Sequence, residues 1–572
     1  MSEALIRFEH FGFQYLAQAE PTLKDINLTI RKGEKILIAG PSGCGKSTLG
    51  NCLNGLIPFS YKGEMTGSLT IAGKETRSMS IFELSKRVGT VLQDSDGQFI
   101  GLTVAEDIAF ALENDCVGRD ELHSRVEEVA GIVGLQGHLS HAPGELSGGQ
   151  KQRVSIAGVM VDDVEIFLFD EPLANLDPAT GKQAMELIDE IRERTGACVI
   201  IIEHRLEDVL HRDVDRIVLM QNGCITADLS PDELLSTDLL KQAGVREPLY
   251  LTALKYAGVK ISAAHRPSNI QKMTLSEEER RAVRDWYRNT ETTALPAPDT
   301  DFLRIRDLDF AYDNGFTALQ NINLQIRKGE LLAIVGRNGA GKSTLSKVIC
   351  GFEKPTRGTL EILDRDGYCD LSNRSIKERA DHIGYVMQNP NQMICKTMIF
   401  DEVALGLRTR GVAENVVKEK VEKALKICGL YAFRNWPVSA LSFGQKKRVT
   451  IASILVLDPD MVILDEPTAG QDFRHYTEIM EFLRSLNEAG YTIVMITHDM
   501  HLMLEYAQRA VVFCDGNILA DDTSANILTD PDLVKRASLK ETSLYDLALL
   551  CDIDDPGSFV QHFIDYDREV RG

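Results

Sequence analysis

The sequence predicts an α/β fold in which one domain occurs twice in tandem, and three observations lead to this prediction. The chain has 572 residues, more than a single hydrophobic core usually organises. Short β-branched apolar runs alternate with longer amphipathic segments, a pattern typical of a mostly parallel sheet covered by helices. An internal repeat divides these segments into two similar halves.

The repeat is defined by landmarks that keep one spacing. GPSGCGKS at residues 40–47 recurs as GRNGAGKS at residues 336–343, and LSGGQ at residues 146–150 recurs as LSFGQ at residues 441–445. Two acidic pairs and two histidines repeat as well, and all of these landmarks are offset by 294 to 296 positions. Such regular spacing indicates a duplicated domain.

Three apolar runs in each half predict the buried strands of its sheet. They lie at residues 36–39, 166–169 and 199–202 in the first half, and at residues 331–335, 461–464 and 492–496 in the second. Each run ends at a glycine or polar residue, as expected where ligands bind at the carboxyl ends of parallel strands.

The segments outside these sheets predict a connector and a tail. We expect a first domain over residues 1–230, a helical connector and linker over 231–300, a second domain over 301–535 and a helical tail over 536–572. Ser276 followed by Glu279 is typical of a capping box at a helix start. Pro296 and Pro298 indicate that the linker proper lies near residues 290–300.

The composition excludes several classes of protein. A net charge of −22 opposes binding to nucleic acid, because such binding depends on Lys and Arg that neutralise phosphates. The 11 cysteines form no Cys-x-x-Cys pair of the kind found in zinc sites, so we expect a reduced, cytoplasmic location. The longest apolar runs are strand-sized, so we expect any membrane role to depend on partner proteins.

Both glycine-rich stretches predict a P-loop, in which backbone N–H groups and a helix N-terminus face the phosphates of a nucleotide. We expect Lys46 and Lys342 to reach the β- and γ-phosphates of ATP, and Ser47 and Ser343 to place a hydroxyl on Mg²⁺. The remaining predicted contacts to the phosphates come from two threonines and six glycines, namely Thr48, Thr344, Gly40, Gly43, Gly45, Gly336, Gly339 and Gly341.

Each acidic pair follows a predicted buried strand and predicts the hydrolytic machinery. Asp170 and Asp465 would complete the Mg²⁺ shell, whereas Glu171 and Glu466 would orient or deprotonate the attacking water. An acidic pair at a strand end is more often a solvated turn, but the P-loops favour the catalytic interpretation. The two histidines, His204 and His498, end a further strand in each half and would contact the γ-phosphate; taken singly, either would more often be structural.

The LSGGQ and LSFGQ motifs precede predicted helices and indicate a second phosphate-binding surface in each half. A serine hydroxyl, glycine N–H groups and the helix dipole would form this surface. Its residues are Ser147, Gly149 and Gln150 in the first half, and Ser442, Gly444 and Gln445 in the second. Because one half needs only one phosphate clamp, we expect the halves to stack head to tail. The connection of roughly 60 residues is long enough for this pairing to occur within one chain, and pairing between two chains is the alternative.

These motifs together resemble those of ABC ATPases over nearly the whole chain. The resemblance implies two P-loop NTPase domains, each with an antiparallel β subdomain and a helical signature subdomain. It also implies that Tyr15 and Tyr312 stack on adenine, although a lone aromatic on an early strand is about as often mere packing. The Q-loop glutamines, which would contact Mg²⁺ and water, are Gln93 and Gln388, and the D-loop residues are Asp177 and Asp472.

By this resemblance, each ATP site would combine residues of both halves. The first would join Lys46, Ser47, Gln93, Asp170, Glu171 and His204 to Ser442 and Gly444, and the second would join Lys342, Ser343, Gln388, Asp465, Glu466 and His498 to Ser147 and Gly149. Both sites carry the expected hydrolytic residues. Phe443 replaces the usual glycine and leaves open whether the two sites are equivalent.

The stretch QNPNQ at residues 388–392 and the segment IEHRLE at residues 202–207 resemble the ATPases of energy-coupling-factor importers. That resemblance implies an integral membrane scaffold, a separate membrane subunit that binds a vitamin, vitamin precursor or transition metal, and a location at the cytoplasmic face of the membrane. A fused ATPase of a sugar importer is one alternative, although such proteins usually have one altered site. A soluble ABC protein acting on ribosomes or DNA is another.

Overall fold

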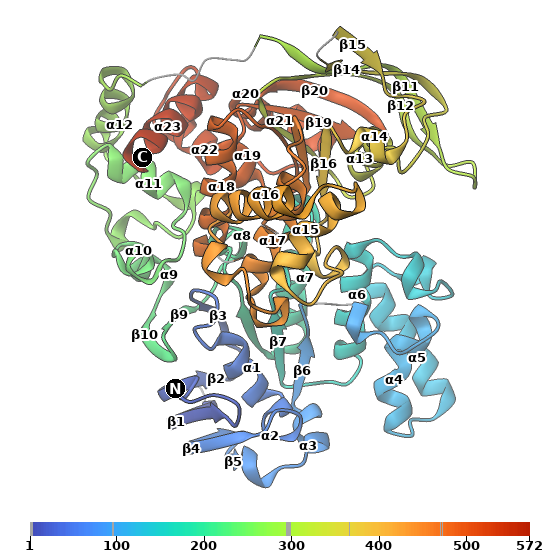
Figure 1. Ribbon diagram of the computed structural model, residues 1–572. Helices are drawn as coiled ribbons and strands as arrows, with labels where there is room; N and C mark the ends of the chain where they lie inside the picture. The colour runs from blue at the N-terminus through green and yellow to red at the C-terminus, as the bar shows by residue number, and fades with distance from the viewer. Residues whose placement is uncertain are drawn as a thin grey trace. The chain divides into compact units, whose positions relative to one another are not determined.

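Each half of the chain contains two sheets (Figure 1). Each sheet of the first half has the same strand order as the corresponding sheet of the second half. The computed structural model describes residues 4–93, 96–174, 176–292, 299–364, 367–468, 471 and 473–571. These residues form two compact units, the first mainly residues 4–286 and the second mainly residues 287–571.

The larger sheet of the first unit has the order β10-β9-β3-β8-β7-β6, in which only β10 is antiparallel to its neighbour. Its strands are β3 (Lys35–Ala39), β6 (Val88–Val91), β7 (Ile166–Asp170), β8 (Cys198–Ile202), β9 (Arg216–Gln221) and β10 (Cys224–Leu229). The second unit repeats this sheet with β13 (Leu331–Gly336), β16 (Ile383–Val386), β17 (Met461–Asp465), β18 (Thr492–Ile496), β19 (Arg509–Cys514) and β20 (Asn517–Thr523). All six predicted buried strands are confirmed.

A smaller antiparallel sheet accompanies each large one. The first contains β1 (Ala4–Tyr15), β2 (Leu23–Arg31), β4 (Gly63–Ile71) and β5 (Lys74–Glu75), and the second contains β11 (Asp301–Ala311), β12 (Thr317–Arg327), β14 (Arg357–Asp364) and β15 (Gly367–Asp370). Alternating burial along these strands turns one face toward the core, because successive side chains of a strand point to opposite faces. The predicted fold class, with its antiparallel subdomains, is confirmed.

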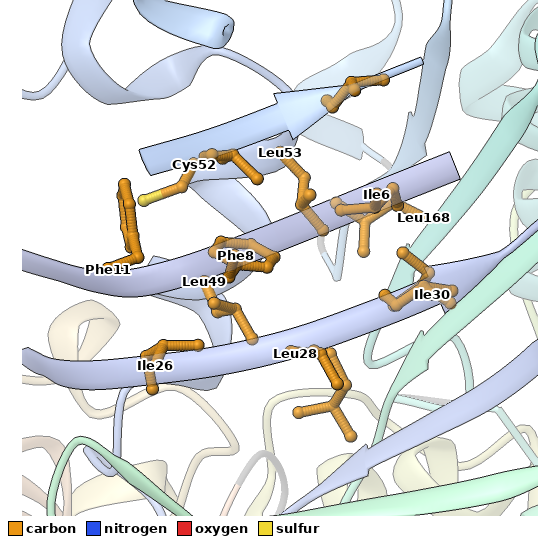
Figure 2. Packing of buried hydrophobic residues seen from close by; sticks show 14 of the residues in the cluster. Ile6, Phe8, Phe11, Ile26, Leu28, Ile30, Leu49, Cys52, Leu53 and Leu168 are labelled. Carbon is orange, nitrogen blue, oxygen red and sulfur yellow. The ribbon is translucent and has the colours of Figure 1, made fainter. Parts of the chain in front are cut away.

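The core of the first unit lies between the small sheet and the helix that follows the P-loop. Figure 2 shows Phe8 and Phe11 of β1 and Ile26 and Leu28 of β2 gathered with the apolar residues of this helix, such as Leu49. These residues are nearly inaccessible to solvent and so stabilise the fold by burying apolar surface. The apolar side of the P-loop helix is therefore fixed by packing against the core.

Some helices of the first unit pack on these sheets, and others form a separate group around the LSGGQ motif. They are α1 (Lys46–Leu53), α2 (Leu56–Phe59), α3 (Ile81–Ser85), α4 (Val104–Asn114), α5 (Arg119–Ile132), α6 (Gly148–Met160), α7 (Pro178–Thr195), α8 (Leu206–Val209), α9 (Pro231–Leu235), α10 (Leu239–Ala243) and α11 (Leu249–Tyr256). Helices α4, α5 and α6 contact one another (Figure 1). This group is the helical subdomain that the resemblance implies.

The second unit has the corresponding helices and a helical tail. They are α13 (Lys342–Cys350), α14 (Ile376–Arg379), α15 (Ile399–Thr409), α16 (Glu414–Ile427), α17 (Phe443–Leu455), α18 (Phe473–Glu488), α19 (Met500–Tyr506), α20 (Ser524–Leu528), α21 (Pro531–Ala537), α22 (Ser543–Leu550) and α23 (Pro556–Arg571). Helices α15, α16 and α17 form its helical subdomain. Among the described residues, no helix combines the length and the apolar character needed to cross a membrane.

Helix α12 (Glu277–Asn289) begins at the predicted capping box. The Ser276 N–H donates to a carboxylate oxygen of Glu279 at 2.8 Å, and the Glu279 N–H donates to the Ser276 hydroxyl at 3.3 Å. This exchange satisfies N–H groups that have no partner within the helix. Pro296 and Pro298 of the predicted linker lie outside the described residues.

Candidate nucleotide-binding sites

The P-loop of the first unit connects β3 to α1 through positions that require glycine. Gly40 has φ 152°, and a Cβ there would lie 2.3 Å from the Met220 carbonyl oxygen. Gly45 has φ 105°, and its Cβ would lie 2.8 Å from a Leu23 methyl group. A side chain at either position would therefore displace backbone or core atoms. Gly43 also has a left-handed φ, of 74°, but faces open space.

The second P-loop, between β13 and α13, repeats this geometry. A Cβ on Gly336 would lie 2.2 Å from the Phe513 carbonyl oxygen, and one on Gly341 would lie 2.7 Å from that of Ala318. Gly339 has φ 79° and faces open space, as Gly43 does. The two loops therefore have the same shape for the same steric reasons.

The two P-loop lysines lie inside their loops. The Lys46 ammonium donates to the carbonyl oxygens of Gly40 and Pro41 at 2.8 and 3.0 Å, and only 7% of the residue is exposed. Lys342 donates to the carbonyl oxygens of Gly336 and Arg337 at 2.7 and 2.9 Å. Each loop therefore combines a fixed positive charge with the N-terminus of a helix, a combination that suits a phosphate chain.

Strand register brings the predicted magnesium ligands of the first unit together. Asp170, the last residue of β7, pairs with Ile202 of β8, and Ile202 pairs with Ile38 of β3, the strand that leads into the P-loop. The Ser47 hydroxyl donates to the Asp170 carboxylate at 3.4 Å. Burial, together with the negative charge of Glu171, raises the pKa of Asp170 to about 6.

Glu171 of the first unit lies between two predicted partners. Gln93 donates to one of its carboxylate oxygens at 2.6 Å, and Nδ1 of His204 lies 3.8 Å from the other. Burial acts to raise the pKa of Glu171, but the contact with His204 and nearby positive charges outweigh it, so this pKa is lowered. A carboxylate that stays ionised is suited to accept a proton from water or to orient it.

His204 also lies against a carboxylate that the sequence analysis did not select. Nδ1 of His204 is 3.2 Å from Oε1 of Glu203, which is fully buried and accepts the backbone N–H of His204 at 2.9 Å. Burial acts to lower the pKa of His204, but the charge of Glu203 and the contact with Glu171 raise it overall. The first imidazole is therefore shared between two carboxylates.

The second unit pairs its histidine and glutamate more directly. Nδ1 of His498 lies 2.7 Å from Oε1 of Glu466, and the Thr497 hydroxyl donates to Oε2 at 3.4 Å. Thr497 occupies the position that corresponds to Glu203, so this unit has a neutral residue there. Glu171 and Glu466 both have left-handed backbones, with φ 49° and 45°, which is a strained conformation for glutamate.

The predicted magnesium ligand Asp465 has a partner that is missing from the first unit's sequence. The Tyr385 hydroxyl donates to the Asp465 carboxylate at 2.9 Å, whereas threonine occupies the corresponding position 90. Burial raises the pKa of Asp465, although the hydrogen bond from Tyr385 opposes this. The backbone carbonyls of Met387 and Gln388, next to this strand, accept hydrogen bonds from the ammonium of Lys447.

The two predicted adenine-stacking tyrosines lie beside the P-loop helices. The Tyr15 hydroxyl is 3.1 Å from the Thr48 hydroxyl, and the Tyr312 hydroxyl is 3.0 Å from that of Thr344. The Tyr15 ring meets Phe13 edge to face at 4.7 Å between ring centroids. These contacts place both rings near the P-loop, and their contact with adenine stays a prediction.

The LSGGQ and LSFGQ motifs begin helices through reciprocal caps. The Ser147 N–H donates to the Gln150 side chain at 2.9 Å, and the Gln150 N–H donates to the Ser147 hydroxyl at 3.4 Å. Ser442 and Gln445 repeat these bonds at 3.0 and 3.3 Å. Both serines are exposed, and so is Phe443, at 42%. Gly149 and Gly444 belong to the first turns of these helices.

The predicted D-loop residue of the first unit caps a helix. Asp177 precedes α7, and its carboxylate accepts the Thr180 N–H at 2.9 Å. This bond accounts for the burial of Asp177, and a role in coupling two sites stays a prediction. The corresponding Asp472 lies outside the described residues.

Three residues that the sequence motifs do not include contact the predicted site residues or the segments that carry them. They are Glu203, Tyr385 and Lys447. A comparison of the two halves at corresponding positions would have singled them out, because each differs from its counterpart in charge or in side-chain length. Those counterparts are Thr497, Thr90 and Gln152, in the same order.

The residues present fit ATP and Mg²⁺. Glycines at the close approaches leave the loop backbone room to face phosphates, and a buried lysine supplies positive charge. Hydroxyl, carboxylate and amide oxygens are the donors that Mg²⁺ prefers, and Ser47, Asp170 and Gln93 supply them in the first unit. Ser343, Asp465 and Gln388 are the same donor types in the second.

Comparison with known proteins identifies two family models along the chain. The model described as ABC transporter matches residues 23–174 and 319–469. A second model, described as ATP-binding cassette cobalt transporter, matches residues 237–310, which include most of the helical connector.

Curated relatives match over their whole length. A putative ABC transporter ATP-binding protein of Clostridium perfringens is 58% identical, over 100% of this chain and 99% of the relative. A putative ABC transporter ATP-binding protein of Enterococcus faecalis is 56% identical over 100% of both chains. Among solved structures, cbiO1 from Clostridium perfringens, part of the ABC transporter complex cbiONQ, is 33% identical with a TM-score of 0.38, over 41% of this chain and 94% of that chain.

Proposed function

The chain belongs to the ABC transporter family, with two ATP-binding domains in one polypeptide, and we propose that it is the motor of an energy-coupling-factor importer. The predictions of the family and of ATP hydrolysis are confirmed by these matches. The proposed cargo is a vitamin, a vitamin precursor or a transition metal, and a separate membrane subunit would bind it. The motor would act at the cytoplasmic face of the membrane.

One observation carries this proposal, namely the family model of a cobalt transporter's ATP-binding cassette over residues 237–310. It covers a segment outside the catalytic motifs, which all ABC ATPases share, and so bears on the type of transporter. The QNPNQ stretch supports the same conclusion. Its Asn389 side chain accepts the Asn391 N–H at 2.9 Å and so shapes a turn that is available to a scaffold protein.

We propose the following division of work within each site. Lys46 and Lys342 would neutralise phosphate charge, and the P-loop N–H groups would orient the phosphates. Ser47, Asp170 and Gln93, with their counterparts Ser343, Asp465 and Gln388, would hold Mg²⁺, which when bound would neutralise charge on the phosphates. Glu171 and Glu466 would hold the attacking water, and the adjacent histidines would contact the γ-phosphate.

The exposed signature serines support head-to-tail pairing of the two halves. Ser147 and Ser442 stand at helix N-termini, where an anion is favoured, and each would complete the site of the opposite half. ATP binding would then close the halves and hydrolysis would open them. The membrane scaffold, docked beside Gln93 and Gln388, would receive this movement.

Affinity purification from detergent-solubilised native membranes tests the proposal. The tagged chain is expected to retain small, very hydrophobic multi-span proteins in stoichiometric amounts, identified by mass spectrometry. An untagged culture processed in parallel supplies the background. Recovery of ribosomal proteins or DNA-repair factors, or of no membrane protein above that background, would contradict the importer assignment and leave the ATPase activity untouched.

A further inference from the structure

Lys447 is a buried cation on the signature helix of the second unit. It lies on α17, five residues after Ser442, and is only 1% exposed. Its ammonium donates to the carbonyl oxygens of Met387 and Gln388, both at 2.8 Å. These two carbonyls belong to the segment that carries the predicted Q-loop glutamine. Lys447 therefore joins the signature helix to the Q-loop of the same unit.

Lys447 carries a charge that packing alone does not require, because burying an ammonium costs free energy. Burial disfavours the charged form and lowers the pKa of Lys447 to about 8, although the negative charges of Asp465 and Glu466 oppose this shift. A buried charge is destabilising unless hydrogen bonds and nearby charges compensate for it. Here the two carbonyl oxygens accept hydrogen bonds from the ammonium, and the carboxylates of Asp465 and Glu466 add negative charge nearby.

At the position that corresponds to Lys447, the first unit has a neutral residue that makes a different contact. Gln152 occupies the corresponding position of α6, and its amide donates to the Pro172 carbonyl, next to Glu171. A neutral residue is thus sufficient for packing at this point of the helix. The two signature helices are therefore joined to different catalytic segments, the Q-loop in the second unit and the segment after Glu171 in the first.

We propose that Lys447 is a positioning residue that holds the Q-loop of the second unit against its signature helix, so that the two ATP sites are not equivalent. By fixing the Gln388 backbone, Lys447 orients the Gln388 side chain for Mg²⁺ and water. Movement of this Q-loop then requires movement of α17. This inference rests on the proposed role of Gln388 and is independent of the transported cargo.

Vanadate trapping of a photoreactive ATP analogue measures each site separately in the intact chain. Irradiation attaches 8-azido-ATP near the adenine, and peptide mapping assigns the label to the first or second unit. Lys447→Met removes the ammonium and keeps an unbranched side chain. We expect it to lower the label trapped in the second unit roughly tenfold, with the first unit changed by less than about twofold. The Kd for ATP is expected to stay within about threefold.

Three further variants separate positioning from general damage. Lys447→Arg keeps the charge and donors and is expected to restore at least half of the trapping. Lys447→Gln introduces the first unit's residue and is expected to show the same loss in the second unit as Lys447→Met. Lys418→Met, at an exposed lysine of α16, is expected to change neither label.

Several results would overturn the inference. Equal losses in both units, or a loss confined to the first, would show that Lys447 acts through general stability or through the signature motif. Unchanged trapping in Lys447→Met would show that its hydrogen bonds do not position the Q-loop. Absence of trapping in the unmodified chain would remove the site assignment on which the inference rests, whereas the absence of a membrane partner in the purification would leave the inference standing.

Discussion

The two proposed catalytic glutamates occupy the same strained backbone conformation at the ends of corresponding strands. The Glu171 N–H donates to the Ile202 carbonyl at 2.8 Å, and the Glu466 N–H donates to the Ile496 carbonyl at 2.9 Å. These bonds hold the glutamates beside the strands that lead to the histidines. Strain that is kept in both copies is typical of a functional position, because surrounding contacts must maintain it.

Replacement of both glutamates by glutamine tests their role at the level of single residues. Glutamine keeps the size of the side chain but removes the base that would accept a proton from water. We expect the Glu171→Gln, Glu466→Gln double variant to lose ATP hydrolysis by about a hundred- to ten-thousand-fold. Steady-state phosphate release measures the effect.

ATP binding provides the control for this double variant. The Kd for ATP, measured by equilibrium binding, is expected to be unchanged within a few-fold, because neither glutamate lies in the P-loops. Hydrolysis that persists at more than a tenth of the normal rate would assign the chemistry to other residues.

Alanine substitutions at two P-loop glycines distinguish a steric clash from the cost of a strained backbone. Gly40→Ala would place a methyl group 2.3 Å from the Met220 carbonyl oxygen, so the loop must shift, and we expect ATP binding to be lost. Gly43→Ala meets nothing within 4 Å and adds only the cost of a left-handed alanine, about 1–2 kcal/mol. We therefore expect Gly43→Ala to retain measurable ATP binding. Equal ATP affinities of the two variants in an equilibrium-binding assay would contradict this account.

At the scale of elements, the P-loop helix of the second unit ends on a buried arginine. Arg379 of α14 donates from Nη1 to the carbonyl oxygens of Val348 and Ile349, at 2.8 and 3.0 Å, at the end of α13. Burial lowers its pKa, but a guanidinium still stays charged at neutral pH. A cation at this position is also favoured by the dipole of the helix. The first unit has Leu84 at the corresponding position.

Arg379→Leu, which introduces the first unit's residue, is expected to destabilise the second unit. The carbonyls at the end of α13 lose charge-assisted hydrogen bonds, which contribute about 1.5–3 kcal/mol each to stability. We expect the thermal unfolding transition of this unit to fall by several degrees, measured by calorimetry. Lys377→Leu, at an exposed position on the same helix, is the matched control and is expected to change it by less. An unchanged transition in Arg379→Leu would show that the end of α13 is stabilised elsewhere.

At the scale of the whole molecule, one chain carries the residues of both proposed ATP sites. If the halves pair within one chain, the Glu171→Gln, Glu466→Gln double variant should remain at the mass of one chain when saturated with ATP and Mg²⁺. Slow hydrolysis would keep the closed state populated, and its hydrodynamic radius should fall. Size-exclusion chromatography with light scattering measures both quantities. A doubled mass that depends on ATP would show that pairing occurs between chains.

The sequence by itself determined the fold class, the duplication and most members of each proposed site. Asp170 ends a buried strand, Lys46 and His204 each come after one, and parallel strands place their carboxyl ends at one edge of a sheet. Local motifs and strand periodicity were therefore enough to predict that these residues converge. The same argument holds for the second unit, because its strands have the same order.

Only the tertiary structure decided which side chains meet within that edge. Lys447 reaches carbonyls about 60 positions earlier in the chain, and Tyr385 reaches a carboxylate 80 positions later. His204 lies between the carboxylates of Glu203 and Glu171, whereas His498 bonds directly to Glu466. Such contacts depend on how helices and strands pack and on the direction of each side chain. Neither property is encoded in a local motif, because both result from the balance of burial and hydrogen bonding over the whole unit.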